Sequence, residues 1–562
     1  MDNQKSSYDF HCGLEPPLAF LRSQWKAVLV FGGGFCLVML GVVMFVDPAF
    51  FYPRIQTDPL NYLLKAKALA ETGSTSARWA VNLPPFAYAA FPGVMRVPLI
   101  IAFTDFDSQL RAIQIVNIPI VASAALVSAY FLSWTLPPSR HWLAIGFAFA
   151  FTMLSPFWIM NVFLPLADAP YALFTLCALL VASSIICSRK PLSHQPVTLA
   201  VFAVLFIASF LLRFTAPVIA VFVVILARGR SMSSGTPPHV RRSLIAASVI
   251  GLMILVGLNA NAIFGRYLRE PIGFLIKGEK IGMTMNLLGA AIPSQVVPNF
   301  QLGFVHPPIA DAYRTNFTES PLDTAWLAVG LAIAAVVITG LWQSRRRFLP
   351  EIGYFLAALP VLGLMMPSTT RYLMSYQPLI WIFFYTGAAY LLSRYSSRIP
   401  SALKSRAFVT ALLVVAAGTV VGLRVWRLGG TASERYFAVT ASSAPDYIHD
   451  VASTFRGLRN FLETLPPEKT LLLGPRGTDG RWKIIANRDY YRADSALHAV
   501  ARTRDVYLVA DCGTGEECQA FTIWEKRLEE KLQKFGRFEF DSVYEKEVRR
   551  AHVKVVRVRA VD

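Results

Sequence analysis

The chain has 562 residues, of which 54% are hydrophobic, 13% aromatic and only 16% charged. Soluble domains carry roughly 25% charged residues, so this composition excludes an ordinary soluble enzyme, and it is too apolar for a disordered chain. The net charge of +19 would indicate nucleic-acid binding if the basic residues formed one face or one tail, but they lie in short clusters between apolar runs. No nucleic-acid partner is therefore expected.

Apolar runs of about 20 residues cross a bilayer core as helices, and they recur along this chain. The first run follows Arg22 and Lys26 and is too long for a cleavable signal peptide, so it is expected to remain as a span. We predict a polytopic α-helical membrane protein with about eleven transmembrane helices, at 27–46, 112–136, 142–163, 169–187, 197–212, 215–227, 243–264, 325–342, 352–366, 373–392 and 407–423.

The stretch 197–227 decides the topology. As one helix it would measure about 46 Å, too long for a hydrocarbon core of about 30 Å, and it carries Arg213 and Pro217 near its middle. Two short helices are the better interpretation. They place the basic segments 344–348 and 393–406 on the same side as the N-terminus, as the positive-inside rule requires. We expect an inner (plasma) membrane protein with a cytoplasmic N-terminus.

The predicted domains are a cytoplasmic segment 1–26, a transmembrane domain 27–423 with outer loops 47–111 and 265–324, and an extracytoplasmic α/β domain 424–562. In the tail, patterns typical of helices cover 445–466 and 518–534, and those of strands cover 470–474, 506–511 and 551–560. Cys512 and Cys518 belong to this domain and are expected on the oxidising side of the membrane, where a disulfide can persist. The sequence does not decide whether the two are bridged or are free thiols. The tail has no phosphate-binding glycine motif, so we expect it to dock or position rather than to catalyse.

The first outer loop holds the segment "YPRIQTDPLNYLLKAKALAETG" (52–73), in which Asp58 precedes Pro59 and an amphipathic helical pattern ends at Gly73. The local interpretation is that Asp58 is an N-cap, Pro59 is the first helical residue and the helix lies along the interface. A capping aspartate is also a positioned one, so a functional role stays open.

This loop and four later segments together resemble the GT-C superfamily of membrane glycosyltransferases, over about residues 20–425. The nearest relatives by pattern are the lipid A aminoarabinose transferases and the protein O-mannosyltransferases. The chain lacks their acidic pair in the first loop, which puts protein O-mannosylation in doubt. The four segments are "YAAFPGVMRVPLI" (88–100), "FLPLADAPYALFTLCALLVASS" (163–184), "FLLRFTAPVIA" (210–220) and "TTRYLMSYQPLIW" (369–381).

The resemblance implies an inverting enzyme that transfers a sugar from a polyprenyl-phosphate donor to an extracytoplasmic glycan, lipid or protein. Inversion needs a base opposite the leaving group, and a phosphate leaving group needs positive charge rather than a strong acid. Asp58 matches the first-loop carboxylate of the superfamily and is the expected base. Asp168 is the expected second carboxylate, with a helix cap as its alternative. No cofactor is expected, and a divalent metal is an alternative that the sequence does not favour; Asp105 and Asp107 are expected to cap a turn.

The expected donor-phosphate contacts are basic residues near the outer ends of apolar segments. Arg213 and Arg371 end or open such helices, where snorkelling to the interface is the alternative. Arg269, Lys277 and Lys280 belong to the second large outer loop, for which a solvated loop is the plain interpretation. Tyr62, one turn after Asp58, and Tyr372 are the expected substrate-binding aromatics, with packing as the alternative for Tyr62.

Two other classes of protein remain open from the sequence. A transporter or flippase of lipid-linked intermediates would show matching halves and charges at mid-membrane, but the halves do not match and the spans are nearly free of charge apart from Arg213. A non-catalytic scaffold that recruits a partner through its tail would not need Asp58.

Overall fold

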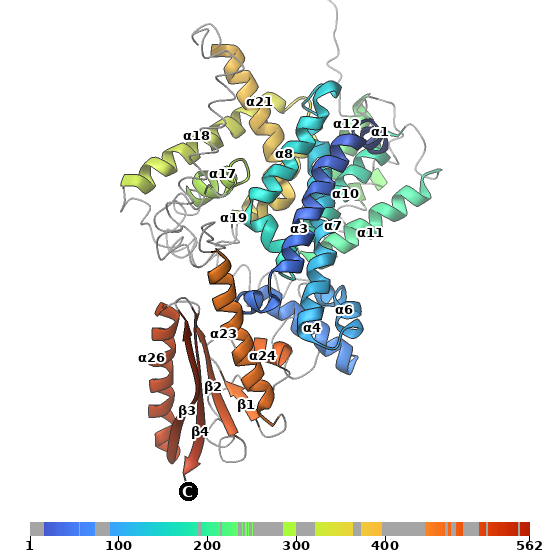
Figure 1. Ribbon diagram of the computed structural model, residues 1–562. Helices are drawn as coiled ribbons and strands as arrows, with labels where there is room; N and C mark the ends of the chain where they lie inside the picture. The colour runs from blue at the N-terminus through green and yellow to red at the C-terminus, as the bar shows by residue number, and fades with distance from the viewer. Residues whose placement is uncertain are drawn as a thin grey trace, which may run out of the picture. The chain divides into compact units, whose positions relative to one another are not determined.

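The computed structural model describes the chain in segments (Figure 1). Contacts divide the chain into unit 1, which comprises Met1–Leu37, Pro119–Ile159 and Ala167–Arg424, and unit 2, which comprises Val38–Ile118, Met160–Leu166 and Val425–Asp562. The described residues are 16–55, 57–73, 90–188, 194–213, 216–233, a few between 239 and 250, 285–298, 300, 321–363, 372–395, 444–466, 470–473, 479–486, 505–512, 515–548 and 551–561.

Unit 1 is helical throughout the part that the structure describes. Three helices, α3 (Gly34–Phe45), α7 (Phe106–Ser133) and α9 (Pro156–Phe163), run from one unit into the other. The remaining helices of unit 1 are α1 (Pro17–Ser23), α2 (Trp25–Ala27), η1 (Val28–Gly33), η4 (Pro138–Arg140), α8 (His141–Leu154), α10 (Asp168–Cys187), α11 (Pro196–Leu212), η6 (Ala216–Val218), α12 (Ile219–Ser233), η8 (Leu287–Ala291), α17 (Ile292–Ser294), α18 (Pro321–Ser344), α19 (Leu349–Gly363), η10 (Leu373–Tyr376) and α21 (Gln377–Tyr395).

Four helical segments among the described residues are long and apolar enough to cross a membrane: Trp25–Phe45, Phe106–Ser133, Asp168–Cys187 and Thr324–Ser344. A fifth span results if the helices on either side of Ser155, which bend by 72°, count as one. These segments coincide with predicted spans, and the shorter helices α11, α12, α19 and α21 coincide with four more. The count of eleven stays a prediction, because span 407–423 lies outside the described residues and span 243–264 lies almost wholly outside them.

The break predicted within 197–227 is present. Helix α11 ends at Leu212, and Arg213 has the extended conformation φ −152°, ψ 134°. A short helical turn, η6, begins at Ala216 and leads into α12. Pro217 helps to explain why the chain cannot continue as one helix, since it lacks the N–H donor that would bond to the carbonyl of Arg213 in a continuous helix.

Helices α18 and α21 approach each other closely at two glycines. A Cβ atom on Gly340 would collide with the carbonyl oxygen of Phe383, and one on Gly387 would collide with that of Val336. Small residues allow this kind of close helix packing within membranes.

We expect Gly340→Ala to lower the thermal stability of the protein in detergent, because the added methyl group must force two backbones apart at a cost of about 1–3 kcal/mol. Gly41→Ala in α3 is the matched control, since its Cβ would meet nothing within 4 Å. The measurement is the apparent Tm of both variants. Equal Tm values would contradict the close approach.

In unit 2, residues 47–111, predicted to be the first outer loop and named so below, contain η2 (Pro48–Arg54), α4 (Thr57–Thr72), α5 (Ala90–Val94) and α6 (Val97–Ala102). The predicted amphipathic helix is α4, and Gly73 follows it with φ +67°, a conformation that glycine adopts without strain. One detail of the prediction is wrong: the helix begins at Thr57, so Asp58 is its second residue and not its N-cap. Pro59 is still in the first turn, where proline is tolerated.

Unit 2 also contains an α/β structure formed by the C-terminal segment Val425–Asp562. Its sheet has the order β1-β2-β4-β3, with β1 parallel to β2 and the other neighbours antiparallel. Figure 1 shows α26 along one face of this sheet and α23 along the other. The elements are α23 (Ala444–Thr464), β1 (Thr470–Leu473), α24 (Asp479–Ile485), β2 (Asp505–Cys512), α26 (Gly515–Leu532), η14 (Gln533–Phe535), β3 (Arg537–Val548) and β4 (Ala551–Val561).

The sequence predicted both long helices and three of the four strands of this structure, but missed β3. That strand pairs only with β4 and is exposed over most of its length, so charged residues occupy positions where a buried strand would be apolar. The side chains of Cys512 and Cys518 lie outside the described part, and the disulfide stays open.

Candidate active site

Three of the predicted site residues come together in unit 1. Asp168, the first residue of α10, forms an ion pair between its Oδ1 and Nη2 of Arg213, and both side chains are only 2% exposed. The ring of Tyr372 lies against the same guanidinium, with 4.1 Å between the ring centroid and Cζ of Arg213. A buried ion pair and a partly exposed aromatic ring therefore form one cluster, the Asp168–Arg213–Tyr372 cluster, from three segments that are far apart in the sequence.

Local structure explains this convergence. Arg213 follows the last residue of α11. Its N–H still donates to the carbonyl of Ser209 at 2.9 Å, so the backbone of Arg213 is held at the end of the helix although its own conformation is extended. The hydroxyls of Thr175 and Ser209 lie 3.0 Å apart and join α10 to α11. These contacts fix the helix ends that carry Asp168 and Arg213.

Polar contacts also hold the segment that follows Tyr372. The indole of Trp158 donates to Oε1 of Gln377 at 2.7 Å, and the indole of Trp381 donates to the carbonyl of Gln295 at 2.6 Å. Tyr372 directly precedes η10, whose four residues are all buried. The aromatic side of the cluster is therefore supported by a well-packed turn.

The geometry differs from both alternatives that the sequence left open for these residues. The N-cap of α10 is Ala167, so Asp168 is not a helix cap, although a carboxylate in the first turn is favoured by the helix dipole. Arg213 does not snorkel to a surface but is buried against Asp168. A buried ion pair gains little net stability, because the desolvation of both charges offsets their attraction. Ionisable groups between apolar helices instead mark functional sites.

Sequence reasoning missed two tyrosines close to the cluster in the chain. Tyr171 lies three residues after Asp168, and Tyr376 lies four residues after Tyr372, so each is one helical turn away. Tyr376 stacks on Tyr354 with ring centroids 4.9 Å apart, and it interacts with Tyr171. The one-turn spacing from a candidate residue was the signal that could have identified them.

In unit 2, helix α4 carries Asp58 and Tyr62. The side chain of Asp58 lies outside the described part of the chain. Tyr62 is fully buried, and the guanidinium of Arg96 lies over its ring at 5.9 Å, which supports the packing interpretation over sugar stacking. A Cβ on Gly93 would lie 3.1 Å from the carbonyl oxygen of Tyr62, so the "FPG" segment packs directly on α4.

Hydrogen bonds from three side chains hold the backbone of the segment that precedes Asp168 in the sequence. Arg96 donates to the carbonyl of Leu166 at 2.8 Å and to that of Pro92. From α7, Gln114 donates to the carbonyl of Phe163 at 3.1 Å, and Asn117 donates to those of Val162 and Leu164 at 3.3 and 3.2 Å. These roles could not be predicted from the sequence, because every partner is a backbone carbonyl and all of them except that of Pro92 are distant in the chain.

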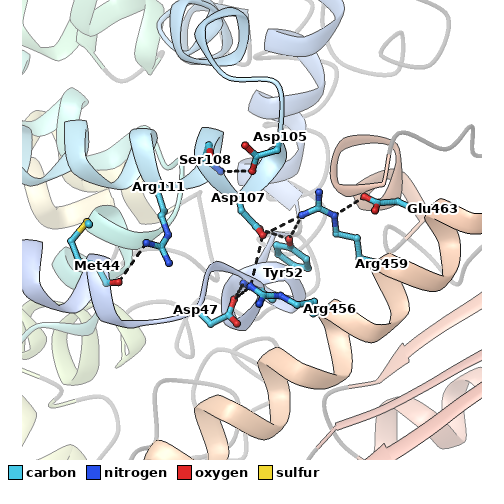
Figure 2. A network of polar contacts seen from close by, with 11 residues as sticks. Met44, Asp47, Tyr52, Asp105, Asp107, Ser108, Arg111, Arg456, Arg459 and Glu463 are labelled. Carbon is cyan, nitrogen blue, oxygen red and sulfur yellow. Dashed lines mark hydrogen bonds and ion pairs between the residues drawn. The ribbon is translucent and has the colours of Figure 1, made fainter.

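A second polar network joins the first outer loop to α23 (Figure 2). Nη2 of Arg456 lies 2.6 Å from Oδ1 of Asp47, and Nη1 of Arg459 lies 3.2 Å from Oδ2 of Asp107. Tyr52 donates to Asp107 and accepts from Arg459 at 3.0 Å. Burial and the charge of Asp107 raise the pKa of Tyr52 far above its usual value, so its hydroxyl stays protonated.

The same network decides the roles of the two predicted capping aspartates. Asp105 accepts from the N–H of Ser108 at 2.9 Å and caps the start of α7, as predicted. Asp107 instead pairs with Arg456 and Arg459. Among the described residues there is no group of three His, Cys, Asp or Glu side chains that could hold a metal ion. The predicted phosphate contacts Arg371, Arg269, Lys277 and Lys280 all lie outside the described residues.

No family model matches the chain, and no curated protein matches it. Among solved structures it is similar to ArnT from Cupriavidus metallidurans bound to undecaprenyl phosphate, at 15% identity over 93% of this chain and 98% of that chain, with a TM-score of 0.43. It is also similar to the oligosaccharyltransferase AglB from Archaeoglobus fulgidus in complex with an inhibitory peptide and a dolichol-phosphate, at 12% identity over 90% of this chain and 72% of that chain, with a TM-score of 0.43. Both are GT-C enzymes, the superfamily that the sequence motifs resemble. At these values the similarity by itself assigns no activity to this chain.

Proposed function

We propose that the chain is an inverting glycosyltransferase that moves a hexose or pentose from a polyprenyl-phosphate donor to an extracytoplasmic glycan, lipid or protein. The observation that supports this most directly is the Asp168–Arg213–Tyr372 cluster. A guanidinium is the side chain best suited to a phosphate, because its planar N–H groups match the phosphate oxygens. Placed where apolar helices end, it is suited to a phosphate carried on a lipid tail.

In the proposed reaction, Asp58 accepts the proton of the acceptor group as that group attacks the anomeric carbon of the sugar. The bond between this carbon and the phosphate oxygen breaks, and polyprenyl phosphate leaves with the electron pair. Negative charge develops on the leaving phosphate, and Arg213 stabilises it. Arg371, Arg269, Lys277 and Lys280 are proposed as further phosphate contacts.

Asp168 and Tyr372 have supporting roles in this proposal. Asp168 is a positioning residue that holds Arg213, because a guanidinium can bridge two oxyanions while keeping one of them as a fixed partner. Tyr372 covers one face of the guanidinium and restricts its orientation through a cation–π contact. Tyr62 packs α4 rather than binding sugar. Arg213 is the proposed source of positive charge toward the leaving phosphate, and a divalent metal stays the alternative that the sequence does not favour.

The orientation proposed for the chain follows the charge pattern: a multi-pass protein of the inner (plasma) membrane, with the N-terminus in the cytoplasm and residues 424–562 outside. In this orientation Asp58 lies on the acceptor side, since the first outer loop follows the first span.

The test is turnover by purified full-length protein in lipid vesicles, with a panel of polyprenyl-phosphate sugars labelled separately in the sugar and in the lipid. A cell-envelope extract supplies the acceptors, and mass spectrometry detects the released polyprenyl phosphate. A glycosyltransferase separates the two labels. Movement of both labels across the vesicle with the donor intact would instead identify a flippase and overturn the proposal.

A further inference from the structure

We propose that α23 holds the catalytic loop in place through Arg456 and Arg459, which act as positioning residues for helix α4 and its Asp58. Together with Asp47, Tyr52 and Asp107 they form a set of contacts that we call the loop clamp (Figure 2). The inference rests on the proposed function, because it assigns to the tail a role in the reaction attributed to Asp58.

The loop clamp joins the two ends of the first outer loop. Asp47 lies just after α3, where its Oδ1 also accepts from the N–H of Ala49 at 2.9 Å, and Asp107 lies in the first turn of α7. Arg456 is within ion-pair distance of both, at 2.6 Å from Asp47 and 3.9 Å from Asp107. One guanidinium of α23 therefore ties the residues at which the loop leaves and re-enters the apolar helices.

Tyr52 carries this constraint toward α4. Its side chain is fully buried, and its hydroxyl lies between Asp107 and Arg459. Tyr52 belongs to η2, which ends at Arg54, three residues before α4 begins at Thr57. A connection this short leaves little freedom, so the position of η2 sets the position of the first turn of α4, where Asp58 lies.

A second contact holds α4 near its other end. Nζ of Lys67 donates to the carbonyl of Lys483 in α24 at 3.2 Å and lies 3.7 Å from Glu71. Both ends of α4 are thus connected to the same C-terminal α/β structure. This arrangement fits a domain that has no phosphate-binding motif of its own.

The two arginines are not expected to contribute equally. Arg456 is 48% exposed, and ion pairs at that exposure are screened by solvent. Arg459 is 16% exposed and contacts Asp107, Tyr52 and Glu463 together, at 3.2, 3.0 and 2.7 Å. Burial lowers the pKa of Arg459, but hydrogen bonds to Glu463 and Tyr52 and the charge of Asp107 outweigh it, so the pKa is raised and the charge persists. Arg459 is therefore the residue to change.

We expect Arg459→Ala to lower kcat for sugar transfer by roughly tenfold to a hundredfold, since a displacement of about 1 Å in a catalytic group has effects of that size. The KM for the donor is expected to change by less than about threefold, a smaller effect than on kcat, because the contacts of the loop clamp within the described part of the chain do not include Arg213, the proposed phosphate contact described there. Arg459→Lys should recover part of kcat, since it restores the charge facing Asp107. A loss of kcat and affinity together, with no recovery by lysine, would contradict positioning.

The matched control is Arg557→Ala. Arg557 forms an ion pair with Asp505 at 2.7 Å within the sheet of the same domain and is 24% exposed. The substitution Arg557→Ala removes a comparable ion pair that does not involve the first outer loop, so kcat should stay near the wild-type value. If Arg557→Ala lowers kcat as much as Arg459→Ala, the effect is general destabilisation of the tail and the inference fails.

Hydrogen exchange of residues 57–73 separates the failure of this inference from the failure of the proposed function. Arg459→Ala should exchange faster than wild type in these residues, and Arg557→Ala should not. Unchanged exchange in Arg459→Ala rejects the loop clamp, whatever the turnover. Absence of turnover in the wild-type protein rejects the proposed function, and with it the catalytic part of the inference.

Discussion

Replacing Asp58 by Asn should abolish sugar transfer while leaving the protein folded and able to bind polyprenyl phosphate. A general base contributes roughly 10²–10⁴-fold to the rate, and an amide cannot accept the proton that the carboxylate would take. The substitution keeps the size of the side chain, so α4 should remain intact. The measurement is released polyprenyl phosphate per unit time, with donor binding measured separately.

The control for this prediction lies in the same helix. Glu71 is in the last turn of α4, where its 44% exposed carboxylate lies 3.7 Å from Lys67. Glu71→Gln makes the same chemical change without touching the first turn, and it should transfer sugar at nearly the wild-type rate. Transfer at the wild-type rate by Asp58→Asn would remove Asp58 as the base and leave it a residue of the first helical turn.

The sequence predicted the apolar helices well, because about 20 apolar residues have few alternatives to a membrane helix. The break at Arg213 could also be predicted, because the excessive length of a single helix, the charge of Arg213 and the nearby Pro217 each indicated an interruption in this stretch. Strand β3 was missed because only Phe538 and Phe540 alternate with charged residues, and the pattern is lost at the irregularity between Ser542 and Tyr544, after which most side chains are exposed or only partly buried. Its identity depends on β4, which lies after it in the chain.

The candidate site shows a similar division. Asp168, Arg213 and Tyr372 could each be selected from a local motif, but their convergence depends on how α10, α11 and η10 pack. The roles of Arg459 and Asp107 were harder still to predict from the sequence. Each is a polar residue in an amphipathic or capping pattern, for which a solvated side chain is the ordinary explanation, and their contact joins segments from opposite ends of the chain. The role of Arg96 could not be predicted either, because its partners are backbone carbonyls, which carry no side-chain signal in the sequence.

The Asp168–Arg213 pair allows structural and functional roles to be separated by one set of variants. Removing either charge alone, as in Asp168→Asn or Arg213→Met, leaves its partner buried without an opposite charge. Such changes cost about 3–5 kcal/mol, so both single variants should have a clearly lowered Tm. Replacing both residues by apolar ones, in Asp168→Leu/Arg213→Met, should return the Tm close to that of wild type or above it.

The double variant should nevertheless fail as an enzyme. With no guanidinium, the leaving phosphate loses a charge-assisted contact of about 1.5–3 kcal/mol, so polyprenyl phosphate should bind roughly tenfold to a hundredfold more weakly and turnover should fall at least as far. The control is Thr175→Val/Ser209→Ala, which removes the neutral 3.0 Å contact between α10 and α11 and leaves the charges in place. A stable double variant that still binds polyprenyl phosphate as wild type does would show that the pair is structural and that the phosphate is held elsewhere.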